Sequence, residues 1–331
     1  MTKSFFKTEN LKGLAAFTLL VTAAFTVAVS GNSQTAVKEG IMLWAASVLP
    51  ALFPYLFITH ILSSLKITGK ITGAISPVTE KLFNVNGNCG YALFLSLMSG
   101  YPVGAKCVSD LKTKGLIGDA ESVRAAALCS SSSPVFLIGS VGNLTFNNPL
   151  FGLMLFITHF LSVLAVGFAF SFYKRKERPE KIRRTPAANT DNADNILYDS
   201  VYSAIISVLI VGGIITVFYL FTELMTGLGA MKPLIAFFGL FTDNTAASNG
   251  VANGLFECTK GLKILASGGV FLYTLPVAAA ICGFGGVSVI MQSIAYLKKA
   301  QIKTAPFLLS KTLAAVVNFF LGLILSLLFL A

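Results

Sequence analysis

The chain contains few charged residues for its length, and this shortage excludes a water-soluble protein. Charged residues make up 12% of its 331 positions, hydrophobic residues make up 55%, and the mean hydropathy is +0.77. A soluble domain carries roughly 25% charged residues, because its surface must be hydrated. The composition therefore predicts an integral membrane protein whose surroundings are the lipid bilayer.

Residues and motifs of catalysis are also scarce. The sequence holds two histidines, and it has no GxSxG, no HExxH, no phosphate-binding loop of Walker spacing and no paired acids in a polar segment. Its five cysteines form no CxxC, which excludes a zinc motif and a disulfide framework. We predict no enzyme activity, no catalytic residue, no metal site and no cofactor. We interpret the cysteines as packing residues.

The excess of basic residues does not indicate a nucleic-acid partner. The formal net charge is +11, but the basic residues lie in short loops between apolar runs, where they orient helices in the bilayer. The two histidines, His60 and His159, end matching Phe-Ile-Thr-His strings. We interpret both as groups that hydrogen-bond between helices, and a functional role inside the membrane is the alternative.

The sequence is organised as two similar halves. Residues 38–172 form the first repeat and residues 196–331 form the second. Residues 1–37 form an N-terminal transmembrane helix or a signal-like segment. Residues 173–195 form a linker that we assign to the cytoplasm, because it is rich in basic residues: Lys174, Arg175, Lys176, Arg178, Lys181, Arg183 and Arg184.

Each half contains an apolar segment that is too short to cross the membrane before it is interrupted. The arm 91–98 would be roughly 12 Å long as a helix, whereas the hydrocarbon core is about 30 Å thick. We therefore predict a re-entrant hairpin over 90–114. The first half is completed by a spanning helix at 41–65, an interfacial helix at 68–83, an outward helix at 119–146 that breaks at 130–134, and a closing helix at 149–172.

The second half repeats this order upside down. Its closing helix starts at Pro306, which lies 157 positions after Pro149, where the closing helix of the first half starts. The predicted segments are a spanning helix at 198–223, an interfacial piece at 231–241, a hairpin at 246–269 with its tip at 257–261, a helix at 270–297 that breaks at 282–286, and the closing helix at 306–330. The fold class is an all-α polytopic membrane protein of two inverted-topology repeats, each with a re-entrant helical hairpin and a broken transmembrane helix.

The two hairpin tips and the two helix breaks should meet near the middle of the bilayer, where transporters of this design bind their substrates. Pro134 disfavours helix at Ser133 and leaves backbone carbonyls without partners, which indicates a cavity at that depth. The alternative is that the glycines and serines of these segments only allow close helix packing.

Charged residues near the predicted tips indicate an anionic small-molecule substrate. Lys106 would cost about 2.5–3.5 kcal/mol inside the membrane, so it needs either Asp110 as an ion-pair partner or an anion from the substrate. Glu257 and Lys260 could pair with each other. Glu257 could instead bind a coupling Na⁺ or H⁺, and Lys260 could supply a second positive charge for a dianion.

Four strings resemble those of the YlbJ-type sporulation integral membrane proteins: 49–54 (LPALFP), 98–106 (MSGYPVGAK), 130–134 (SSSSP) and 283–289 (GFGGVSV). That family carries the nucleoside-recognition Gate domain, which is similar to the core of concentrative nucleoside transporters. The resemblance spans most of residues 38–330 and implies carriage of dipicolinic acid, a planar dicarboxylate. It also implies a bacterial cytoplasmic or forespore membrane and a homo-oligomer as one form of assembly.

The resemblance and the predicted breaks together indicate a secondary transporter of a small anionic metabolite, such as a dipicolinate-like dicarboxylate, that works by alternating access. One alternative is a cation-coupled nucleoside transporter, in which Glu257 would bind ribose hydroxyls. Another is a membrane scaffold subunit of a sporulation or envelope complex that transports nothing. The predicted substrate-binding residues are Ser99, Gly100, Tyr101, Pro102, Lys106, Ser130, Ser131, Ser132, Ser133, Pro134, Glu257, Thr259, Lys260, Gly283, Phe284, Gly285, Gly286 and Ser288.

Overall fold

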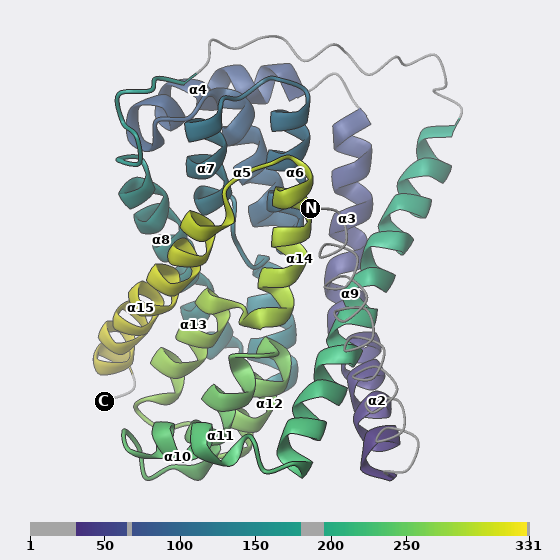
Figure 1. Ribbon diagram of the computed structural model, residues 1–331, viewed down its shortest axis with the longest axis vertical. Helices are drawn as coiled ribbons and strands as arrows, with labels where there is room; N and C mark the ends of the chain where they lie inside the picture. Colours follow the sequence, from purple (N-terminus) through teal and green to yellow (C-terminus); the bar gives the residue numbers. More distant parts are fainter. Residues whose placement is uncertain (1–30, 65–67, 180–194, 330–331) are drawn as a thin grey trace, which may run out of the picture.

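The computed structural model describes residues 31–64, 68–179 and 195–329 (Figure 1). Over these residues the secondary structure is helical and contains no strand. Five of the helical segments are long and apolar enough to cross a bilayer. The predicted all-α polytopic membrane fold is therefore confirmed. Most of the predicted N-terminal segment lies outside the described residues, and helix α2 begins at Gly31, before the predicted boundary at residue 38.

The first half follows the predicted order of elements. Asn86 caps the first arm of the hairpin with its side chain, and Asn148 followed by Pro149 starts the closing helix. Its helices are α2 (Gly31–Leu43), the π-helical turn η1 (Trp44–Val48), α3 (Leu49–Ser64), α4 (Thr68–Phe83), α5 (Gly87–Ser99), α6 (Val103–Thr113), α7 (Asp119–Leu128), the π-helical η2 (Val135–Thr145) and α8 (Pro149–Phe170).

The second half repeats the same series of elements. Asn244 caps the first arm of the second hairpin, and it lies 158 positions after Asn86, close to the 157 positions between Pro149 and Pro306. The helices are α9 (Ile196–Gly227), α10 (Lys232–Gly239), α11 (Thr245–Gly254), α12 (Cys258–Ser267), α13 (Thr274–Phe284), α14 (Gly286–Lys299) and α15 (Thr304–Phe329).

The two hairpins lie in opposite halves of the molecule (Figure 1). Hairpin 1 (α5 and α6) lies at the end that also holds α4, and hairpin 2 (α11 and α12) lies at the end that holds α10. Lys112 in the last turn of α6 and Lys298 and Lys299 in the last turn of α14 lie at the α4 end. The positive-inside rule assigns this end to the cytoplasm, in agreement with the predicted side of the basic linker.

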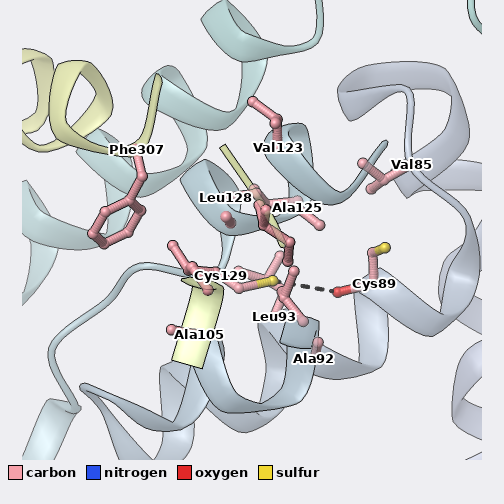
Figure 2. Packing of buried hydrophobic residues seen from close by; sticks show 14 of the residues in the cluster. Val85, Cys89, Ala92, Leu93, Ala105, Val123, Ala125, Leu128, Cys129 and Phe307 are labelled. Atoms are coloured by element: carbon pink, nitrogen blue, oxygen red, sulfur yellow. Dashed lines mark hydrogen bonds between the residues drawn. The ribbon is translucent and has the colours of Figure 1, made fainter. Parts of the chain in front are cut away.

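Small residues allow hairpin 1 to pack directly against α7 (Figure 2). The core here contains Ala92, Ala105 and Ala125, all buried, and the Cys129 thiol donates a hydrogen bond of 3.6 Å to the Cys89 carbonyl. A second unit beside this core is formed by α2, α3 and α9, where the Trp44 indole donates a hydrogen bond of 3.0 Å to the Val208 carbonyl. Close helix packing of this kind replaces the hydrophobic effect as the force that assembles helices in lipid.

Candidate functional site

The tip of hairpin 1 is a short interruption between α5 and α6. Gly100 has a φ of +78°, and a Cβ on it would lie 2.9 Å from the Ser133 amide nitrogen, so only glycine fits. Tyr101 and Pro102 follow, joined by a cis peptide bond. The Ser99 hydroxyl shares a hydrogen bond of 2.5 Å with Thr59 of α3, which fixes the tip against that helix.

The break between α7 and η2 covers residues 129–133, as Pro134 predicts. Its freed backbone groups find partners from other elements: the Cys129 carbonyl accepts a hydrogen bond from the Ser96 hydroxyl at 2.7 Å, and the Ser130 carbonyl accepts one from the Tyr101 hydroxyl at 3.4 Å. The Ser132 amide donates to Nε2 of His159 at 2.9 Å. The predicted interhelical role of His159 is confirmed, because this bond joins α8 to the break.

The tip of hairpin 2 lies earlier than the sequence predicts. Residues 255–257 form the interruption, and the predicted tip residues 258–261 form the first turn of α12. The reason is that the Glu257 carboxylate caps this helix: it accepts hydrogen bonds from the Lys260 amide at 2.7 Å and from the Thr259 hydroxyl. Glu257 is 1% exposed. Its partner is therefore the backbone of α12 and not the Lys260 ammonium.

The second helix break is confined to the junction of α13 and α14. Gly285 and Gly286 have φ values of +81° and +79°, a conformation that two successive residues adopt readily only as glycines. Gly283 and Phe284, which the sequence placed in the break, are the last residues of α13. Beyond the break, the amides of residues 287 and 288 donate to the carbonyls of residues 255 and 256 at 2.8 and 3.0 Å. The N-terminus of α14 thus holds the tip of hairpin 2.

The four interruptions meet at one central cavity of about 60 Å³. Both tips and both breaks contribute to its wall, and α3 and α9 close it with apolar side chains. The polar and glycine residues that line it are Tyr101, Ser132, Ser133, Glu257, Thr259, Gly285, Ser288 and Gln292. The convergence that the sequence predicted is thus present in the fold.

A larger cavity of about 300 Å³ adjoins the central cavity and shares Tyr101 and Gln292 with it. It extends along α6 toward the cytoplasmic end and contains His60, Lys106 and Asp110 in its wall. We call it the vestibule. Lys106 therefore lines the vestibule and not the central cavity. Within the described residues, the Lys106 ammonium and the Asp110 carboxylate form no ion pair with an N···O distance of 4.0 Å or less.

Lys260 does not line the central cavity or the vestibule. Its ammonium lies against α9, where it donates a hydrogen bond of 2.8 Å to the Thr222 hydroxyl and forms an ion pair of 3.7 Å with Glu223. It also lies 5.3 Å from the centre of the Tyr219 ring. This is a correction to the prediction that Lys260 supplies a second positive charge for a dianion, because Glu223 already neutralises it.

The structure adds a charged residue that the sequence analysis missed. Lys311 of α15 is 1% exposed and donates a hydrogen bond of 2.6 Å to the Tyr101 hydroxyl, and its ammonium lies 4.2 Å from the centre of that ring. A Cβ on Gly285 would lie 3.7 Å from the Lys311 ammonium. Lys311 therefore lies between the tip of hairpin 1 and the second break. The signal was available, since it is the one charged residue among the 26 residues of α15.

Comparison with known proteins gives one relative and one structural neighbour. No family model matches the chain. It is 29% identical over 325 residues to the sporulation integral membrane protein YlbJ of Bacillus subtilis (strain 168). The aligned region covers 92% of this chain and 79% of that protein. Its fold is similar to that of a double variant of CNTnw, a concentrative nucleoside transporter, in an outward-facing state, with a TM-score of 0.54 and 13% identity over 96% of this chain and 87% of the other.

The TM-score shows that the chain and CNTnw share a fold. Because the two sequences are only 13% identical, the comparison does not identify the substrate of this chain. The similarity to YlbJ extends over 92% of the chain. The chain is therefore an integral membrane protein similar to the sporulation membrane protein YlbJ, and the resemblance read from its sequence is confirmed.

Proposed function

We propose that this protein is a secondary transporter that moves a small anionic metabolite across the membrane by alternating access. The observation that carries the proposal is the meeting of both hairpin tips and both helix breaks at one cavity. Backbone without helical hydrogen bonds is tolerated at membrane depth where it faces protein or a polar cavity. Inverted repeats that surround such a cavity can expose it to either side of the membrane in turn.

The charges around the cavity support an anionic substrate. The Lys311 ammonium is buried and forms no ion pair with a described carboxylate within 4.0 Å. The Glu257 carboxylate, by contrast, already accepts hydrogen bonds from the first turn of α12. A buried ammonium without a counter-charge favours the binding of an anion, because the anion replaces the lost hydration. Lys106 in the vestibule attracts the same anion on its way to the centre.

A dipicolinate-like dicarboxylate is the substrate that we propose, on the basis of the resemblance to the YlbJ-type proteins. The vestibule, at about 300 Å³, has the size of a site for a small molecule. The aromatic ring of Tyr101, which lines both cavities, offers a flat surface to a planar substrate.

Uptake into liposomes tests the proposal. The purified protein is reconstituted, and the uptake of dipicolinate, other dicarboxylates and uridine is compared with and without gradients of Na⁺ and H⁺. We expect dipicolinate uptake, and we expect Lys311→Met to lower its kcat/KM by about 30-fold or more. The proposed pair is between the Lys311 ammonium and a carboxylate of the bound substrate, and removing one partner of such a buried pair costs about 2–5 kcal/mol. Lys263→Met is the matched control, since the Lys263 side chain is 55% exposed and pairs with Glu39 at the surface.

The alternative functions predict different results in the same experiment. The second candidate substrate is a nucleoside, the class of solute that the structural neighbour is named for. Uptake of uridine that Lys311→Met leaves unchanged would contradict the anion proposal and support that alternative. No uptake of any solute by a folded protein would contradict transport and favour a scaffold role.

A further inference from the structure

Buried polar side chains surround Lys311 on the side that faces away from the central cavity. A small void of about 10 Å³ lies between the first helix break, α8 and α15, and Lys311 is in its wall. Three buried atoms in the same wall have no hydrogen-bond partner within the described part of the chain: Ser130 Oγ, His159 Nδ1 and Asn318 Oδ1. The void is about the size that one water needs, and these atoms with the lysine provide the polar partners that a buried water requires.

Lys311 therefore connects two polar regions. On one side, its ammonium donates to the Tyr101 hydroxyl, which lines the central cavity and donates in turn to the Ser130 carbonyl. On the other side lies the void with the unpaired His159 nitrogen. Ionisable side chains inside the membrane, histidine among them, form proton relays in pumps and transporters.

Within the described part of the chain, the groups that face Lys311 supply no fixed negative charge. The titratable ones are Tyr101 from hairpin 1, His159 from α8, Cys258 from α12 and Cys282 from α13. The adjoining breaks contribute serine and glycine, which do not titrate. The carboxylate in the wall of the central cavity is Glu257, which caps α12. An ammonium at this position lacks a counter-charge until an anion enters the central cavity.

We infer that Lys311 carries a coupling proton, so that one proton crosses the membrane together with each anion. The inference rests on the proposed function. When the anion binds, the lone pair of Nζ takes a proton from water on the loading side, and the ammonium and one carboxylate neutralise each other. When the anion leaves on the other side, the proton returns to water there. The empty carrier then reorients with a neutral amine, which avoids moving an unpaired charge through the membrane.

Thermodynamic linkage makes the inference measurable on the unmodified protein. If anion binding favours the protonated lysine, proton binding favours the anion by the same factor. The wild-type protein in detergent and weak buffer, with a pH indicator, is titrated with dipicolinate. We expect close to one proton taken up per dipicolinate bound, and about a tenfold loss of affinity per pH unit on the alkaline side of the transition. Binding of dipicolinate without proton uptake overturns the inference.

Two variants test whether Lys311 is the group that takes up the proton when dipicolinate binds. Lys311→Arg keeps a positive charge that does not titrate, so dipicolinate should still bind while its proton uptake disappears. Lys263→Arg is the control and should retain the proton uptake of the wild type. Proton uptake that persists in Lys311→Arg overturns the inference and moves the proton to another group such as Glu257.

The same measurements separate this inference from the proposed function. Dipicolinate uptake that depends on a Na⁺ gradient and ignores the pH gradient leaves the transporter proposal standing and overturns proton coupling through Lys311. Failure of every anion to bind or enter overturns both.

Discussion

The contact between hairpin 1 and the first broken helix can be tested by substitution of Gly104. This residue lies in the first turn of α6. A Cβ at this position would lie 1.7 Å from the Cys129 carbonyl oxygen and 2.6 Å from the Ser96 hydroxyl oxygen. The Ser96 hydroxyl donates to this carbonyl at 2.7 Å, so Gly104→Ala places a methyl group inside a hydrogen-bonded contact.

The size of the effect follows from these distances. Real Cβ atoms do not approach other atoms closer than 3.0 Å, so the hairpin and the break must separate by at least 1.3 Å, the difference between 3.0 and 1.7 Å. That shift breaks the Ser96–Cys129 hydrogen bond and leaves a buried carbonyl without a partner, which costs about 1–3 kcal/mol. Overpacking costs about 1–3 kcal/mol more, and the better helix propensity of alanine returns about 0.5–1 kcal/mol. The net loss of stability is therefore about 1–5 kcal/mol.

The assay is thermal unfolding in detergent, followed by uptake in liposomes. Gly104→Ala should lower the unfolding temperature and reduce the initial rate of uptake, because the displaced hairpin carries the Tyr101 tip. Gly213→Ala in α9 is the matched control, since a Cβ at this exposed position meets nothing within 4 Å. If Gly104→Ala unfolds at the same temperature as the wild type, the close packing of hairpin 1 against residues 129–133 is wrong.

Two further predictions concern the second break and the cytoplasmic foot of hairpin 1. Gly286→Ala should destabilise the fold by about 1–2 kcal/mol, because alanine resists a φ of +79°, and should reduce uptake; unchanged uptake and unfolding would contradict this. The Lys112 ammonium lies 2.5 Å from Asp119 and holds the pKa of this carboxyl below its ordinary value of 3.8. A lowered pKa stabilises the fold above that value, and the contribution disappears as the pH falls through the folded pKa. The unfolding temperatures of the wild type and Asp119→Asn should therefore approach each other as the pH falls from about 4 through the folded pKa, and a constant difference at every pH would refute this.

The positions of the interruptions could be predicted where the residues themselves prevent a helix. Pro134 lacks an amide donor and restricts Ser133, so the first break, at 129–133, lies one residue before the predicted 130–134, and Pro134 itself is helical. Gly285 and Gly286 likewise permit the two positive φ values of the second break. The predicted position of the tip of hairpin 2 is less accurate, because Glu257 caps α12 and residues 258–261 therefore belong to that helix.

The candidate site could be predicted in part. The four segments that line the central cavity were identified from their local sequence, since polar and helix-breaking residues are costly inside an apolar run. The partners of Lys260 and Lys311 were not, because each comes from a distant part of the chain. Lys260 pairs with Glu223 on α9, and Lys311 reaches Tyr101 on the other repeat.

The sequence by itself determined that this chain is a polytopic membrane protein with interrupted helices. Composition sets the solvent that a chain can tolerate, and proline and glycine act on the backbone within a few residues. Only the tertiary structure decided which charges share a cavity. Lys311 contacts Tyr101 at the central cavity, Lys106 lines the vestibule, and Lys260 lies against α9, where it pairs with Glu223. The electrostatic energy of a charge depends on its distance to other charges and to water, and that distance is fixed by helix packing across the whole chain.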